Sequence, residues 1–487
     1  MAGKFGFEVN LGAAGAPRDG LLRRSDKMRI LVLGDFSGRH NRGLETTADL
    51  AGRAVLPVDL DCFDAVFRRL SPSLSLGTSA AATAGLDVKF DELEDFHPDR
   101  LYAALEPFGK LRESRARLLD PATFEQEASR LMEGQAELLQ RLIGAPAEPV
   151  SRVSSQGVVD GLIRRLVQPH IKPGSSRAPT PYIAALDASS TELMRGLLHD
   201  AVFQSLEAPW RGVRKLVESL ELGDELTLHI VDVSKGELLA DLEASQGNPL
   251  QSAAHRLLVE TSRRGADDQP WSLLVGHFSF GANAEDIALL GHLGVIASRA
   301  GGPLMAAAEP GLVGCERLSE ATEPRQWAFS DPEVEKRWND LRRSPAARWL
   351  GLAMPRILLR QPYGAKTDPT DSFAFEEFSP VAGHEAYLWG NAALACAQVI
   401  AQGFLDEGSG LRVDGPLEID DLPAHIREQD GERRLQPCAE FTLPVRVGEE
   451  LLQRGMTPLL SYGNRNAVRV LRIQSIAEPL HALAGLG

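Results

Sequence analysis

Residues 28–34 read Met28-Arg-Ile-Leu-Val-Leu-Gly34, and this stretch decides the fold class that the sequence predicts. An unbroken run of Ile, Leu and Val that stops at a Gly-Asp pair is typical of a strand covered on both faces, as in parallel sheets. Helical periodicities alternate with further runs of this kind, at 225–233, 271–275, 355–359 and 467–473. The sequence therefore predicts an α/β fold of the mixed α+β kind.

The charge balance limits the classes of partner. Among 487 residues, 67 are acidic and 52 are basic, so the formal net charge is −15. Nucleic acids and anionic membranes are bound through basic surfaces, so we expect no nucleic-acid partner. Residues 386–405 carry no charge and have the length of a membrane span, but their Ala, Asn and Gln content favours a helix buried inside a domain. We therefore expect no membrane insertion.

Two features of the sequence predict a cytoplasmic location. The first twenty residues have no continuous apolar core of the kind that a signal peptide needs. The four cysteines, Cys62, Cys315, Cys396 and Cys438, lie too far apart for a C-x-x-C pair. We expect four reduced thiols, with neither a disulfide framework nor a zinc site.

Composition divides the chain into three parts. Residues 1–143 read as a small α/β unit, residues 144–182 as a Pro/Ser/Gly-rich linker, and residues 183–487 as a larger α/β unit. Inside the linker, residues 158–167 form a short amphipathic pattern whose apolar face consists of Val158, Val159, Leu162, Ile163, Leu166 and Val167. A helix this short needs a surface on which to form. It either binds a groove on a partner or packs on its own chain, and the pattern leaves both readings open.

The patterns that resemble catalytic motifs fail in detail. Gly34-Asp-Phe-Ser-Gly38 follows a strand as a phosphate loop does, but Arg39-His40 stands where such a loop needs Gly-Lys-Ser/Thr, which favours a Gly-rich turn. In the same way, Gly276–Gly281 has His277 where a hydrolase elbow needs glycine. No two histidines have the spacing of metal ligands on a helix. We predict no catalytic residues, no cofactor and no metal site.

Several longer motifs resemble one protein family. Residues 1–143, with KMRILVLGDFSGR and LDVKFDELEDFHPDRL, resemble the small subunit of the type VI secretion contractile sheath (TssB-like). Residues from 183 onward resemble the large sheath subunit (TssC-like), through the motifs AVFQSLEAPWRGVRKLV, VDVSKGELLADL, WSLLVGHFSF, RWLGLAMPRILLRQPYGAKTDP, FAFEEF and YLWGNAALACAQVIA. The chain thus resembles a natural or engineered fusion of the two sheath proteins.

The resemblance implies a structural protein and not an enzyme. Two sheath-type α/β units would pack together, joined by the flexible linker with its short helix, and would assemble around the inner tube of a phage-tail-like injection machine. The implied partners are other copies or sheath subunits, the inner tube protein, baseplate proteins and a recycling AAA+ ATPase, which would bind the helix at 158–167. Arg211, Arg356, Arg360 and Lys366 are candidates for contacts between protomers or with the tube, and ion pairs inside the domain are the alternative reading.

Two other functions remain as alternatives. The family's large subunit continues beyond the segment matched by 467–475, so we expect the large-subunit-like part to be shortened at its C-terminus. That expectation motivates a non-polymerising sheath-like paralogue that caps, anchors or regulates the sheath or baseplate. A cytosolic enzyme on an α/β scaffold is a remote alternative, because it needs a convergent polar pocket that no motif indicates.

Overall fold

The computed structural model describes residues 27–76, 86–131, 167, 179–260, 269–320, 324–379, 382–408, 417–429 and 432–486. The chain divides into two compact units: unit 1 comprises Met1–Pro72, Leu206–Arg360 and Leu388–Gly487, and unit 2 comprises Ser73–Ser205 and Gln361–Tyr387. Each unit contains chain from both sides of residues 144–182. The compact units therefore do not follow the sequence parts 1–143 and 183–487, and the linker at 144–182 stays a prediction.

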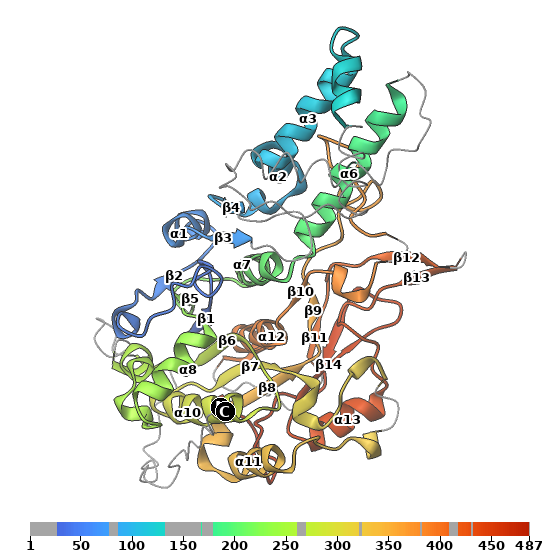
Figure 1. Cartoon of the computed structure of the whole chain (residues 1–487). Helices are drawn as coiled ribbons and strands as arrows, with labels where there is room; N and C mark the ends of the chain where they lie inside the picture. The colour runs from blue at the N-terminus through green and yellow to red at the C-terminus, as the bar shows by residue number, and fades with distance from the viewer. Residues whose placement is uncertain are drawn as a thin grey trace, which may run out of the picture. The chain divides into compact units, whose positions relative to one another are not determined.

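A nine-stranded sheet forms the centre of unit 1 (Figure 1). Its strands, in spatial order, are β11 (Leu417–Ile419), β15 (Val468–Val470), β14 (Thr457–Ser461), β8 (Leu350–Met354), β7 (Leu304–Ala308), β6 (Leu273–Phe280), β1 (Met28–Gly34), β5 (Leu226–Asp232) and β2 (Leu56–Pro57). All neighbours from β14 to β5 run parallel, and β15, β11 and β2 join antiparallel at the edges.

Strand β1 lies inside this sheet and not beside it. It pairs with β5 over its whole length, from Met28 opposite Leu226 to Gly34 opposite Asp232, and it pairs with β6 on its other edge. Its apolar side chains are buried, as expected for a strand with both faces covered. A strand that precedes residues 144–182 is thus inserted between two strands that follow them.

Helices cover both faces of the sheet. Helix α10 (Ala284–Ala300) and helix α12 (Ala392–Glu407) both contact β6, β7 and β8, and they lie on opposite faces (Figure 1). The remaining α-helices of unit 1 are α1 (Phe63–Leu70), most of α7 (Ala201–Ser219), α8 (Lys235–Ala244), α9 (Ala253–His255), α11 (Pro332–Arg343) and α13 (Val445–Gln453). Short antiparallel pairs join β9 (Ile357–Leu358) to β10 (Trp389–Gly390) and β12 (Ile426–Gln429) to β13 (Glu432–Leu435).

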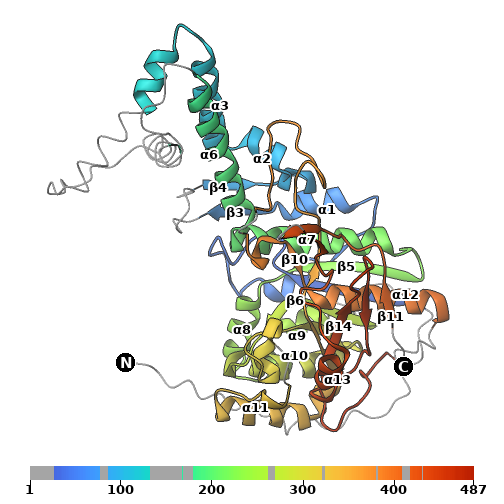
Figure 2. The ribbon, with the colours of Figure 1, turned by 90° about the vertical axis from the view of Figure 1, so that its right-hand side faces the viewer.

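Unit 2 is built mainly from helices. It contains the hairpin of β3 (Ser73–Leu76) and β4 (Leu86–Lys89), followed by α2 (Pro98–Ala104), α3 (Glu106–Leu119) and α6 (Thr180–Leu198). Figure 2 shows α3 and α6 side by side, in agreement with their contacts. The rings of Phe90, Phe96 and Phe203 pack together, with Phe90 and Phe96 stacked at 4.1 Å between centroids.

The expected mixed α/β fold is confirmed, and the structure refines it. The uncharged stretch at 386–405 contains a buried helix, α12, as expected. Among the described residues, none of the helices combines the length and the apolar character needed to cross a lipid bilayer. The two sequence parts do more than pack together, because β1 shares one sheet with the strands of the second part.

Candidate functional site

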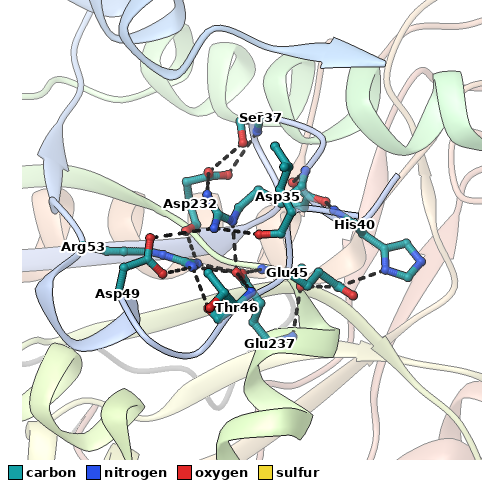
Figure 3. Close-up of polar contacts among 12 residues, drawn as sticks. Asp35, Ser37, His40, Glu45, Thr46, Asp49, Arg53, Asp232 and Glu237 are labelled. Atoms are coloured by element: carbon teal, nitrogen blue, oxygen red, sulfur yellow. Dashed lines mark hydrogen bonds and ion pairs between the residues drawn. The ribbon is translucent and has the colours of Figure 1, made fainter. Parts of the chain in front are cut away.

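A polar cluster gathers where β1 and β5 end, at the carboxyl edge of the parallel sheet (Figure 3). The residues that precede the linker in the sequence come from the loop that follows β1. The residues that follow the linker come from the end of β5 and the first turn of α8. The cluster consists of Asp35, Ser37, Arg39, Glu45, Thr46, Asp49, Arg53, Asp232, Ser234 and Glu237. In an α/β protein this edge is where ligands usually bind.

Asp232, the last residue of β5, fills the position that a ligand would take. Its Oδ1 accepts hydrogen bonds from the backbone N–H groups of Phe36 (2.8 Å) and Ser37 (3.0 Å), and its Oδ2 accepts one from the Ser37 hydroxyl (2.8 Å). Successive N–H groups that point at one oxygen form an anion-binding nest. The likeness of Gly34–Arg39 to a phosphate loop thus has a physical basis, but the bound anion is a carboxylate of the same chain.

Glu237 is the second acidic centre of the cluster, and its side chain is fully buried. It forms a bidentate pair with Arg53, with both N···O distances at 2.6 Å, and it accepts from Arg39 Nε at 3.0 Å. It also accepts from the backbone N–H groups of Thr46 and Ser234, the latter as part of a capping box that begins α8. Every acceptor position of this carboxylate is used, so it has no capacity left for a substrate.

The pKa shifts in the cluster follow from these contacts. Burial raises the pKa of Glu237, but hydrogen bonds from Arg53 and from two backbone N–H groups outweigh that effect and hold the pKa at about 2. Burial raises the pKa of Asp232 above its ordinary value, and the hydrogen bonds from Ser37 only limit the rise. Both acids are bound by internal partners, and we call this cluster the clasp because it joins the loop after β1 to the end of β5 and the start of α8.

An aromatic contact lies near the clasp in unit 1. The indole N–H of Trp210, on α7, donates to the carbonyl of Phe36 at 2.8 Å. The rings of Phe36, Phe63 and Phe67 surround the same indole, with centroid distances of 4.4 to 5.8 Å. All four side chains are fully buried, and the three phenylalanines precede the linker while the tryptophan follows it. The surface between the two sequence parts therefore has an apolar centre beside its polar clasp.

Unit 2 contains a second set of contacts across the linker. Asp99 accepts from the backbone N–H groups of Asp371 and Ser372, each at 2.9 Å, and the ring of Tyr102 stacks on Phe373 at 4.3 Å between centroids. Burial raises the pKa of Asp99, but these hydrogen bonds lower it below its ordinary value overall. The DFHPD segment before the linker thus anchors the FAFEEF segment after it.

The arginines predicted to bind other molecules have intramolecular partners. Arg211 Nε and Arg360 Nε both donate to Glu207 Oε1, at 2.5 and 3.0 Å, and the Glu207 side chain is fully buried. Arg356 forms an ion pair with Glu440 at 2.6 Å. These are the intradomain ion pairs that the sequence left as the alternative, and the contacts with protomers or tube stay predictions.

The other predicted binding residues lie apart from these ion pairs. Lys366 is exposed on a turn of unit 2. The helix expected at 158–167 lies almost wholly outside the described residues, which exclude Val158, Val159, Leu162, Ile163 and Leu166. Val167 is described, and it is helical and buried. Binding of a partner by this helix stays a prediction.

Sequence reasoning missed the residues that join the two parts. Ser234 and Glu237 have the S-x-x-E spacing of a capping box, which could have placed the start of α8. Asp232 ends an apolar run, which marks the carboxyl edge of a strand. Neither signal identifies Arg53 as a partner, because 184 residues separate Arg53 from Glu237.

Comparison with known proteins assigns the chain to a family. Residues 180–477, more than half of the chain, match the family described as "EvpB/VC_A0108, tail sheath N-terminal domain". The chain belongs to this tail sheath family. Residues 27–143 match a second family, described as "Type VI secretion system, VipA, VC_A0107 or Hcp2". The resemblance to a fusion of the two sheath proteins is thereby confirmed.

Two relatives from Pseudomonas aeruginosa match the same two parts of this tail sheath chain. The type VI secretion system sheath protein TssC1 is 35% identical over 304 residues, which cover 61% of this chain and 61% of TssC1. The type VI secretion system sheath protein TssB1 is 27% identical over 120 residues, which cover 24% of this chain and 66% of TssB1. The chain thus spans less than two thirds of the length of each relative.

Proposed function

We propose that this chain is a structural subunit of a contractile type VI secretion sheath, in which one polypeptide supplies the equivalent of both sheath proteins. The position of β1 carries the proposal. A strand from the TssB-like part lies between two strands of the TssC-like part, with a complete register on one edge. Such interleaving is an obligate interface, and its role is mechanical and not catalytic.

Fusion of the two parts has a direct physical advantage. A linker converts the pairing of two chains into an intramolecular step, with an effective concentration of roughly millimolar. It also fixes the ratio of the two parts at one to one. Both effects suit a subunit that must be added many times to one regular assembly around an inner tube.

Electron microscopy of the purified protein tests this proposal. A sheath subunit forms long tubes with a regular axial repeat, whereas a protein that caps, anchors or regulates a sheath remains as discrete particles. Mixing with the inner tube protein of the same organism supplies the second arm, because a sheath subunit polymerises around preformed tubes. Discrete particles in both arms would contradict the sheath role and favour the capping role.

The expected partner helix requires a separate test. We propose that residues 158–167 bind the AAA+ ATPase that recycles the sheath. Deletion of these ten residues should abolish capture of the ATPase and leave the tryptophan fluorescence of the chain unchanged. A matched control substitutes Asp160, Arg164 and Arg165 on the opposite face by serine, and this variant should still capture the ATPase. Equal capture by the deletion variant and the intact chain would contradict the proposed contact.

A further inference from the structure

The apolar pattern of β1 does not by itself determine where the strand pairs. Ile30, Leu31, Val32 and Leu33 are all buried, and the facing strand β5 is also largely apolar, except at the half-buried Thr227 and His229 and at Asp232. A slip of two residues along β5 would keep every side chain on its original face of the sheet. Hydrophobic burial therefore favours insertion of β1 but discriminates weakly between this register and the next.

The contacts of Asp232 do depend on the register. Gly34 lies opposite Asp232, so the loop that follows β1 passes over the Asp232 carboxylate. Two backbone N–H groups and the Ser37 hydroxyl bind it, at 2.8 to 3.0 Å. A slip of two residues moves these donors by about 6.6 Å. All three hydrogen bonds would then be lost, and a buried carboxylate would remain without partners.

The loop also closes on itself around this carboxylate. Asp35 accepts from the backbone N–H groups of Arg39 (2.7 Å) and His40 (2.9 Å), which fixes the turn. Arg39 and Arg53 then reach Glu237, five residues beyond Asp232. The first sequence part thus presents positive charge and aligned N–H groups, and the second part presents two acids at one strand-to-helix junction.

We propose that the loop from Asp35 to His40, with Arg53, is a carboxylate receptor that recognises Asp232 and Glu237 and thereby holds β1 in place beside β5. Its ligand is an acidic segment of the same chain that carries two carboxylates with this spacing. The receptor acts during pairing of the two sequence parts, so the inference does not rest on sheath assembly around a tube.

Chemical rescue tests the receptor in the full-length chain. Asp232→Ala removes the bound carboxylate and leaves a space that formate can fill. A protease site placed within 144–157 allows the linker to be cut after folding, so that the separation rate of the two parts in urea can be measured. The matched control is Asp224→Ala, an exposed acid just before β5.

We expect the Asp232→Ala chain to separate about ten- to a hundredfold faster than the intact chain, because hydrogen bonds to a buried charged acceptor are lost. Formate at neutral pH should restore part of the difference, and chloride at the same ionic strength should not. The proposal would be overturned if the Asp232→Ala chain separated no faster than the Asp224→Ala control. It would also be overturned if formate and chloride had equal effects on the Asp232→Ala chain.

Two milder variants keep the test decisive if Asp232→Ala does not fold. Asp232→Asn keeps the shape and removes the charge, and Ser37→Ala removes one donor. Each should speed the separation, with the larger effect for Asn, since a neutral amide accepts weaker hydrogen bonds from the two backbone N–H groups than the carboxylate does. Unchanged rates for both variants would equally reject a carboxylate receptor.

Discussion

Glu237→Gln is the substitution that tests the clasp between the two sequence parts most directly. Gln has nearly the shape of Glu, so packing is retained and only the charge and one acceptor oxygen are lost. The Glu237 carboxylate meets five donors: two nitrogens of Arg53, one of Arg39 and two backbone N–H groups. The amide nitrogen of Gln would face some of these donors without any acceptor to offer.

The magnitude follows from burial. The Arg53 side chain is only 7% exposed and that of Glu237 is 0% exposed, so removal of the negative charge leaves a poorly solvated guanidinium whose remaining acidic partner is the exposed Asp49, at 2.9 Å. Removal of one partner of a buried ion pair lowers the free energy of unfolding by about 3 to 5 kcal/mol. The matched control is Glu285→Gln, an exposed acid in the first turn of α10, which should change stability by less than about 0.5 kcal/mol.

Tryptophan fluorescence provides the assay, because all six tryptophans of the chain belong to unit 1, which also contains Glu237. Urea unfolding followed by this signal therefore reports the unit that carries the substitution. We expect the midpoint of Glu237→Gln to fall well below those of the intact chain and of Glu285→Gln. Coincident unfolding curves for the two variants would refute the assignment of Glu237 as a stabilising centre.

Three further predictions concern other parts of the molecule. The fully buried His292 has no hydrogen-bond partner for either ring nitrogen among the described residues, and burial lowers its pKa to about 4. The unfolded chain binds this proton near pH 6.5 and the folded chain does not, so stability should fall by about 1.4 kcal/mol per pH unit from pH 6.5 towards 4. Urea titrations at several pH values give the slope of the unfolding free energy against pH. His292→Leu should reduce this slope by the contribution of one proton, and an unchanged slope would contradict the assignment. In unit 2, Asp99→Ala should free residues 371–372 and speed proteolysis within 361–387, whereas the exposed Asp91→Ala should not; equal cleavage rates would argue against the anchor. Trp210→Phe removes a buried N–H and ring area that touch Phe36, and we expect a loss of about 1 to 3 kcal/mol in calorimetric unfolding; a loss below 0.5 kcal/mol would contradict the aromatic contact.

The sequence predicted individual elements well and their partners poorly. The run at Met28–Gly34 coincides with β1, and the uncharged stretch at 386–405 contains the buried helix α12, as expected. These signals are local, because periodicity records which side chains are buried. That β1 lies between β5 and β6 depends on pairing across roughly 200 residues, which no periodicity encodes.

The candidate site illustrates the same limit. Arg211 and Arg360 are candidates for external contacts or for ion pairs inside the domain, and both bind the buried Glu207, which no motif in the sequence identifies as their partner. An ion pair between distant residues becomes visible only when the fold brings them together. The sequence favours a Gly-rich turn over a phosphate loop at Gly34–Arg39, and it does not predict that backbone N–H groups of this turn bind the side chain of Asp232.

The central position of β1 also has a consequence for synthesis of the chain. Met28, at the start of β1, leaves the ribosome 198 residues before Leu226, at the start of the strand that pairs with it. At typical translation speeds this interval is roughly 10 to 40 s. Throughout that time an apolar strand has no edge to join, and unpaired strands of this kind are prone to aggregate. Because both parts are on one polypeptide, the delay has a fixed upper bound, whereas a separately synthesised strand would have to find its sheet by diffusion.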